Sequence, residues 1–170
     1  GTACGVIIDG CPAGLLIDLK KIQNFLDRRR PGQSHLSSPR KESDKLEVLS
    51  GLEKGKTLGS PITLIVKNHD VKKSDYKDLS KGFRPSHADH SYWLKYGILA
   101  SSGGGRASAR ETWARVAAAG VALEVLEQLS PQTKVFAYVD SLHKICLKNS
   151  YPQNISREQI EKREGRWELF

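Results

Sequence analysis

The chain has 170 residues, of which 38% are hydrophobic and 27% are charged, so we expect one globular domain with its own core rather than two independent ones. Its formal net charge of +8 favours anionic partners, such as phosphorylated small molecules, nucleic acid or an acidic membrane face. The pattern argues against a transmembrane helix, a disulfide framework and a CxxC-type zinc site, and we recognise no secretory signal in it.

The first part of the chain predicts a strand, a helix and two further strands. An apolar run closed by a turn predicts a strand over residues 4–10. Residues 15–30 place apolar side chains at helical spacing, and Pro31-Gly32 stops that helix. A polar, basic loop follows. Residues 45–51 and 60–68 then predict strands, the second with β-branched residues near its centre.

A long helix is predicted to end at Ser130-Pro131. Its apolar positions recur every three or four residues: Trp113, Val116, Gly120, Leu123 and Leu126. The AAAG segment within it has almost no side-chain bulk, so we expect a buried central helix that another element approaches closely. Residues 134–147 alternate in a way that predicts a strand covered on both faces. Beyond residue 148 the pattern weakens, and a short charged helix and a frayed end are both compatible with it.

A glycine-rich segment precedes the long helix. Gly103–Gly105 lack β-carbons, so the backbone can turn sharply and approach a ligand closely. Ser108 and Glu111 fit the S-x-x-E capping box, which predicts Ser108 as the helix N-cap. Arg106 and Arg110 add positive charge there. Cations in the first turn of a helix oppose the helix dipole, so a sequence shaped for stability alone would place acidic residues at these positions, whereas a bound anion explains the arginines. We interpret the segment as an anion site; the alternative is a glycine turn before a well-capped helix. It is neither a P-loop nor a GxGxxG fingerprint.

Two histidines bracket an aspartate in the segment HADH. His87, Asp89 and His90 could contribute ligands to a metal, but no further cluster stands nearby to complete a coordination shell. A structural or acid–base role is therefore the stronger interpretation. A histidine beside a bound phosphate is suited to donate a proton, and His35 lies in an equally basic stretch.

Several long motifs together resemble the chorismate synthase family. They are DRRRPGQS, RPSHADHSYWLKYG and GGGRASARETWARVAAAG, in the family's order, with VIIDGCPAGL before them and LSGLEKGKTLGSPITLIVKNHD between. The resemblance implies an α+β fold, a β-α-β sandwich in which helices pack between antiparallel sheets. It also implies an activity: the anti-1,4-elimination of phosphate from 5-enolpyruvylshikimate 3-phosphate, which gives chorismate for aromatic amino acid biosynthesis. The reaction requires reduced FMN without net redox change.

The resemblance assigns roles by motif position. It makes His87 the acid on the flavin side and places Arg106, Ala107 and Ser108 in contact with FMN. The carboxylates and phosphate of the substrate are held by Arg29, Arg84 and Arg110. His35 stands where the family has a further arginine at the phosphate. Arginine suits these groups because its planar fork meets carboxylate and phosphate oxygens in bidentate fashion. The resemblance implies no metal.

The resemblance also implies a homotetramer, with NADPH as the reductant in some members, and a cytoplasmic or plastid location. It implies no nucleic-acid or membrane partner. The family's second catalytic histidine and its C-terminal half are missing from this sequence. We therefore expect residues 1–170 to form a single partial domain, similar to the family over 1–147 and inactive alone. The alternative is a non-catalytic domain that binds flavin, nucleotide or RNA phosphate.

Overall fold

The computed structural model describes residues 2–30, 43–68, 82–98, 104–135, 137–146 and 158. Contacts divide the chain into two compact units, Gly1–Ser130 and Pro131–Phe170, and each is described by itself. The element order is β1 (Ala3–Ile8), α1 (Leu19–Arg29), β2 (Glu47–Ser50), β3 (Leu52–Glu53), β4 (Lys56–Thr57), β5 (Ile62–Lys67), α2 (Asp89–Tyr96), η3 (Gly105–Ala107), η4 (Ala109–Glu111), α3 (Thr112–Leu129), β6 (Ser141–Leu142) and β7 (Ile145–Cys146). Within these ranges, no helix combines the length and hydropathy needed to cross a membrane.

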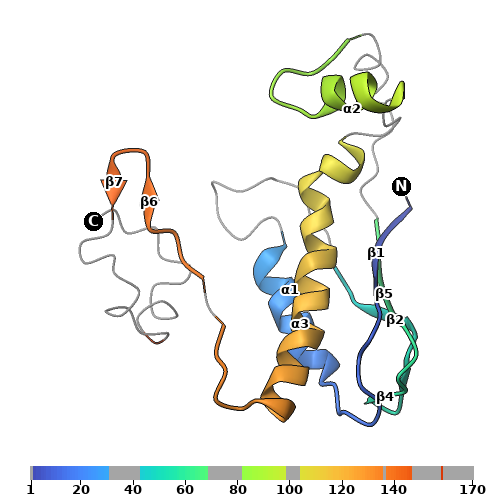
Figure 1. Cartoon of the computed structure of the whole chain (residues 1–170). Coiled ribbons are helices and arrows are strands. Elements are labelled where there is room, and N and C mark those ends of the chain that lie inside the picture. Colours follow the sequence, from blue (N-terminus) through green and yellow to red (C-terminus); the bar gives the residue numbers. More distant parts are fainter. Residues whose placement is uncertain are drawn as a thin grey trace. The chain divides into compact units, whose positions relative to one another are not determined.

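The main sheet has three antiparallel strands in the order β1-β5-β2 (Figure 1). Its central strand β5 alternates strictly, because Ile62, Leu64 and Val66 are buried while the residues between them are only partly covered. The edge strand β1 aligns Cys4 with Val66, so the two buried positions lie side by side. The strands predicted over 4–10, 45–51 and 60–68 are therefore confirmed, with ends that differ by one or two residues: β1 begins one residue before its predicted range and ends two earlier, and β2 and β5 are shorter at both ends.

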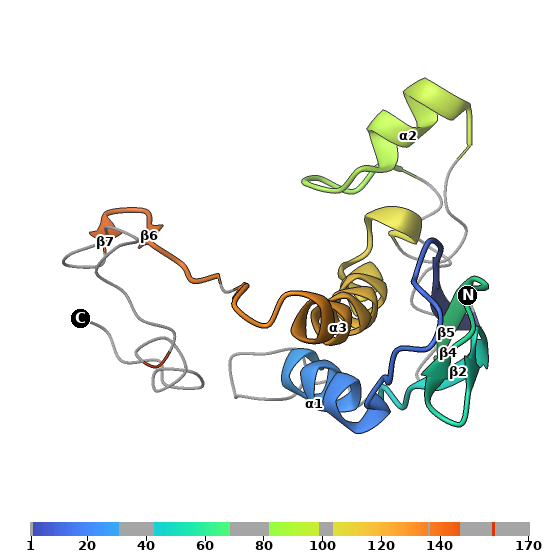
Figure 2. The same ribbon diagram turned by 60° about the horizontal axis from the view of Figure 1, so that its bottom comes forward.

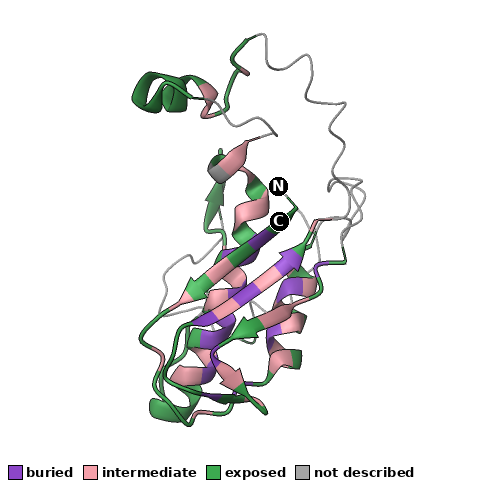
Figure 3. Cartoon of the chain, turned by 90° about the vertical axis from the view of Figure 1, so that its right-hand side faces the viewer, coloured by how far each residue is buried: buried purple, intermediate pink, exposed green. Residues whose placement is uncertain are grey.

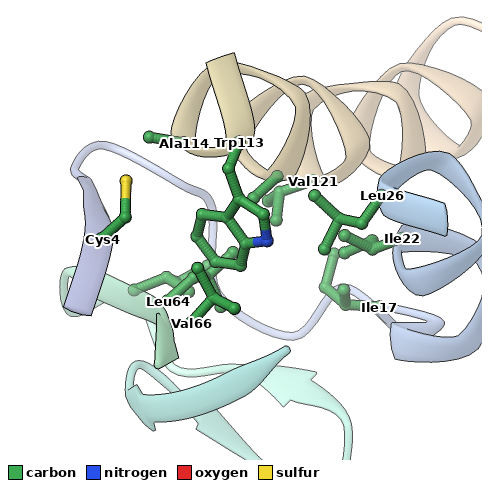
Figure 4. Packing of buried hydrophobic residues seen from close by; sticks show 11 residues of the cluster. Cys4, Ile17, Ile22, Leu26, Leu64, Val66, Trp113, Ala114 and Val121 are labelled. Atoms are coloured by element: carbon green, nitrogen blue, oxygen red, sulfur yellow. The ribbon is translucent and has the colours of Figure 1, made fainter. Parts of the chain in front are cut away.

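Helix α3 packs on one face of this sheet, α1 packs against α3, and the two helices supply the rest of the core (Figures 1 and 2). Helix α1 begins after Asp18, whose carboxylate accepts a hydrogen bond from the backbone N–H of Lys20 at 2.9 Å, and it buries Ile22 and Leu26 one turn apart. From α3, Trp113 points toward Leu64 and Val66 (Figure 4). Figure 3 shows buried positions both on the strands of the sheet and on the helices behind it.

The small residues of α3 allow α1 to approach closely, as the sequence predicts. A β-carbon placed on Gly120 would lie 3.1 Å from two side-chain carbons of Ile22, closer than ordinary van der Waals contact. The buried face of α3 is formed by Trp113, Ala114, Ala117, Gly120, Val121 and Glu124. Arg115 and Ala119 lie on the opposite side and are exposed. In the described residues, α3 is thus covered by α1 and the sheet on one side only.

The prediction of one long strand over 134–147 is wrong. The structure has a hairpin of two-residue strands, β6 and β7, and before it residues 134–135 and 137–140 are not strand. Val135 and Val139 are 62% and 73% exposed. Alternation of apolar residues makes a segment suitable for a sheet, but a strand also needs a partner edge to hydrogen-bond with. Within the described part of the second unit, the pairing is limited to that of β6 with β7.

Candidate oxyanion-binding site

The start of α3 is built differently from the predicted single cap. Two short 3-10 turns, η3 and η4, precede the α-helix, which begins at Thr112. Ser108 does act as a cap, but for η4: its Oγ accepts a hydrogen bond from the backbone N–H of Arg110 at 3.2 Å. The prediction of Ser108 as N-cap of the α-helix itself is therefore corrected: one turn of 3-10 helix lies between Ser108 and the first residue of the α-helix.

Glycine is favoured in this turn for steric and conformational reasons. A β-carbon on Gly104 would lie 3.1 Å from the backbone nitrogen of Ser108, and Gly105 has a φ of +53°. The chain folds back tightly here, since the backbone N–H groups of Ala107 and Ser108 donate to the carbonyls of Gly104 and Gly105 at 2.9 and 3.1 Å. Gly103 lies outside the described residues.

Arg110 meets residues that come from two distant loops. Its Nε donates to Oδ1 of Asn68 at 3.0 Å, and its Nη1 forms a short hydrogen-bonded ion pair with Oδ1 of Asp44. Asp44 is wholly buried although it is a carboxylate, and it has a φ of +46°. A buried carboxylate without a paired cation would be strongly unfavourable, so Asp44 and Arg110 depend on each other.

A hydrogen bond from α1 holds the backbone of Asp44 in place. The side-chain amide of Gln23 donates to the carbonyl of Asp44 at 3.2 Å, and its oxygen accepts from the backbone N–H of Leu46 at 2.9 Å. One glutamine thus spans the segment that leads into β2. Helix α1 thus holds the backbone that carries Asp44, just before β2 begins.

Arg29, at the last turn of α1, completes the group. Its Nη2 lies 3.6 Å from Oδ2 of Asp44, on the other side of the carboxylate from Arg110. Burial lowers the pKa of the Arg29 guanidinium from its ordinary value, Asp44 opposes that change, and the like charge of Arg110 reinforces it. The guanidinium still carries its proton at any physiological pH, because the ordinary pKa of an arginine side chain is far above that range. We refer to Arg29, Asp44, Asn68 and Arg110 as the Asp44 cluster.

The Asp44 cluster holds more hydrogen-bond donors than acceptors. The side chains of Arg29 and Arg110 are only 16% and 20% exposed. Among the described residues, Nε and Nη1 of Arg29 and Nη2 of Arg110 are buried and have no hydrogen-bond partner. Buried donors in native proteins are nearly always paired, with protein, water or a ligand. Two guanidinium groups against one carboxylate leave a net charge of +1, and the donors without partners are of the kind that bind phosphate and carboxylate oxygens.

A second group of predicted residues lies together in a turn before α2. Arg84 pairs with Asp89 through two hydrogen bonds, Nε to Oδ2 at 2.7 Å and Nη2 to Oδ1 at 2.8 Å. These bonds hold the pKa of the Asp89 carboxyl at about 2. His87 is exposed, and its Nδ1 lies 3.0 Å from the carbonyl oxygen of Pro85.

The structure places the predicted site residues in three ways. Arg29 and Arg110 meet in the Asp44 cluster, although 81 positions separate them in the sequence. Arg84 and His87 share the turn before α2, and Ala107 and Ser108 lie in the 3-10 turns. His35 and the side chain of Arg106 lie outside the described residues. Across the described ranges, no three His, Cys, Asp or Glu side chains are grouped closely enough to hold a metal ion.

Sequence reasoning missed two members of the Asp44 cluster. Asp44 lies in the polar loop segment KESDK, and Asn68 follows β5 directly. An acidic residue in a charged loop is normally solvated, so no local pattern marks Asp44 as buried. The one available signal is indirect: arginines predicted to lie in a site need a counter-charge nearby.

Comparisons with known proteins agree on one family. A family model described as chorismate synthase matches residues 1–166. The chorismate synthase of Prochlorococcus marinus strain NATL2A is 53% identical over 162 residues, which cover 95% of this chain and 44% of that protein. That of strain MIT 9312 is 57% identical over 145 residues, 85% of this chain and 40% of that protein. A crystal structure of a chorismate synthase matches with a TM-score of 0.52 and 33% identity, over 75% of this chain and 32% of that chain. The chain thus spans less than half the length of these relatives.

Proposed function

Because this chain belongs to the chorismate synthase family, we propose that it supplies the oxyanion-binding part of an enzyme that eliminates phosphate from 5-enolpyruvylshikimate 3-phosphate to give chorismate. The observation that carries this proposal is the set of buried guanidinium donors without partners in the Asp44 cluster. The substrate carries two carboxylates and one phosphate. These are the anions that planar guanidinium groups bind best.

Arg29 and Arg110 act in two ways in this proposal. They bind and orient the anionic substrate, and they stabilise the negative charge that gathers on the phosphate oxygens as the carbon–oxygen bond breaks. The second effect is larger in a site with little water, and both guanidinium groups are mostly buried. The fixed Asp44 carboxylate keeps them in place, so little reorganisation is needed when the phosphate leaves.

The family implies a reduced flavin as cofactor. The donor chemistry of this part of the chain fits such a group, because guanidinium N–H groups can hold a flavin phosphate as well as a substrate phosphate. We propose that Arg106, Ala107 and Ser108 contact it; Ala107 is exposed and bears only a methyl group, so a flat ring can approach its backbone. When bound, reduced FMN supplies the electron and base chemistry for an elimination without net redox change. His87 donates a proton on the flavin side.

The remaining parts of the proposal come from the family alone. His35 lies near the substrate phosphate, Arg84 belongs to the same site, and NADPH or an outside reductant keeps the flavin reduced. The enzyme assembles as a homotetramer and acts in the cytoplasm.

Substitution of one arginine by lysine tests the oxyanion role. Arg110→Lys keeps the charge but loses the planar fork, so we expect the affinity for 5-enolpyruvylshikimate 3-phosphate and for inorganic phosphate to fall about tenfold. Arg115→Lys is the matched control, because Arg115 is exposed in the first turns of α3, five positions after Arg110, and the affinity of this variant should stay within about twofold of the unchanged protein. Titration calorimetry measures both ligands, and anaerobic chorismate formation with reduced FMN measures turnover in a protein of the relatives' length. Unchanged affinity in Arg110→Lys would contradict the proposal.

A further inference from the structure

We propose that Arg84 and Asp89 are positioning residues that orient His87, and that Nε2 of His87 is the nitrogen that exchanges the catalytic proton. The assignment of a catalytic proton rests on the proposed function, whereas the orientation of the ring rests on the geometry of residues 84–89. The sequence marks Arg84 only as an anion-binding residue, and the structure points to a different use of its guanidinium.

The turn is held together by bonds between its two ends. Besides the two guanidinium bonds, the backbone N–H of Arg84 lies 3.4 Å from Oδ2 of Asp89, and the backbone N–H of His87 donates to the carbonyl of Arg84 at 3.3 Å. Asp89 is also the first residue of α2, where a carboxylate is favoured by the helix dipole. Side chain and backbone therefore fix the same short segment from both ends.

Backbone conformations inside the turn need this support. Ser86 has a φ of +61°, a left-handed conformation that costs a residue other than glycine about 1 kcal/mol or more. Such a conformation persists only where the surroundings determine it. Pro85, next to it, has a fixed φ and aims its carbonyl oxygen at the ring of His87. The ion pair between Arg84 and Asp89 is the contact that closes this strained segment.

The contact with Pro85 determines which histidine nitrogen carries a proton permanently. A backbone carbonyl can only accept a hydrogen bond, so at 3.0 Å the Nδ1 of His87 must be the donor. Nδ1 keeps its proton in both the neutral and the charged ring. Proton exchange therefore takes place at Nε2, which makes no hydrogen bond to any described residue.

Arg84 has a restricted capacity for substrate in this arrangement. Nε and Nη2 form the side of the guanidinium that meets a carboxylate in bidentate fashion, and both are committed to Asp89. Arg29 and Arg110, by contrast, keep donors without partners. The geometry thus separates arginines that bind the anion from one that holds the proton donor.

NMR on the 170-residue chain tests the orientation directly. Long-range ¹H–¹⁵N correlations above the histidine titration range should show His87 as the Nδ1–H tautomer. His143 is exposed and should show the Nε2–H form that prevails in free histidine. Asp89→Asn and Arg84→Lys should both shift His87 toward Nε2–H. Circular dichroism checks that each variant is folded. An Nε2–H tautomer in the unchanged chain, or no shift in both variants, would overturn the proposal.

Kinetics in a protein of the relatives' length separates positioning from binding. Asp89→Asn should lower kcat about tenfold or more while KM for the ester stays within about twofold, because the substrate contacts are intact. A ligand role for Arg84 would instead raise KM in Arg84→Lys with kcat retained, which would sink the positioning role. If the proposed function itself is wrong, the unchanged protein shows no turnover, yet the tautomer result stands independently.

Discussion

Replacing Asp44 by asparagine removes one negative charge from the Asp44 cluster without changing its size. Asparagine tolerates the left-handed φ of +46° at this position, so the substitution adds little backbone strain. It leaves Arg29 and Arg110 facing each other with no buried counter-charge. Removing one partner of a buried ion pair costs about 3–5 kcal/mol. Because the side chains of Arg29 and Arg110 are still 16% and 20% exposed, we expect a loss at the lower end of this range, about 3 kcal/mol of unfolding free energy.

Urea unfolding of the chain, followed by circular dichroism and by tryptophan fluorescence, measures this loss. Trp113 lies in the core between α3 and β5, so its emission reports the unfolding of the first unit. Asp9→Asn is the control, because Asp9 is exposed and its variant should lie within about 0.5 kcal/mol of the unchanged chain. A loss below about 1 kcal/mol in Asp44→Asn would refute the argument that Asp44 balances the two arginines.

Phosphate should partly restore the Asp44→Asn variant, which links its stability to the proposed function. An anion bound between the guanidinium groups takes over the role of the missing charge. At ten times its dissociation constant, a ligand adds about 1.4 kcal/mol to the unfolding free energy of the protein it binds. Chloride at equal ionic strength controls for screening. If phosphate and chloride act alike, the donors of Arg29 and Arg110 do not form an oxyanion site.

Two further predictions concern the glycines and the turn before α2. Gly51→Ala should be more destabilising than Gly10→Ala by about 1–3 kcal/mol of unfolding free energy, measured by urea unfolding. Both glycines have positive φ, but a β-carbon on Gly51 would lie 2.6 Å from Cα of Ile62, whereas Gly10 has open space around it. Equal losses in the two variants would show that the contact with β5 does not matter. The ion pair of Asp89 with Arg84 depresses the carboxyl pKa to about 2, below the ordinary value of an unfolded chain, so its contribution is complete above about pH 4 and disappears as the pH falls toward 2. An NMR titration of the Asp89 carboxyl carbon measures this midpoint, and a midpoint near 4 would contradict the ion pair.

Local patterns in the sequence determine most of the secondary structure. Strand β5 and helices α1 and α3 follow from alternating or helical spacing of apolar residues, and the small residues around Gly120 indicate that a neighbouring element can approach α3 closely, as Ile22 does. These features depend on residues a few positions apart. The sequence likewise singles out Arg29 and Arg110 as site residues, because their motifs match those of a family.

Only the tertiary structure decides which of these residues act together. Asp44 becomes the centre of a site because the fold brings Arg110 to it from 66 positions away, and no charge pattern near Asp44 indicates that it is buried. The orientation of His87 depends on a hydrogen bond to Pro85 and an ion pair across a strained turn, neither of which a motif specifies. The segment 134–147 has the alternation of a strand, but among its described residues the pairing is limited to a short hairpin, since a strand requires a partner edge. Side-chain periodicity is a local property of the chain, whereas burial, counter-charges and strand partners arise from contacts between distant segments.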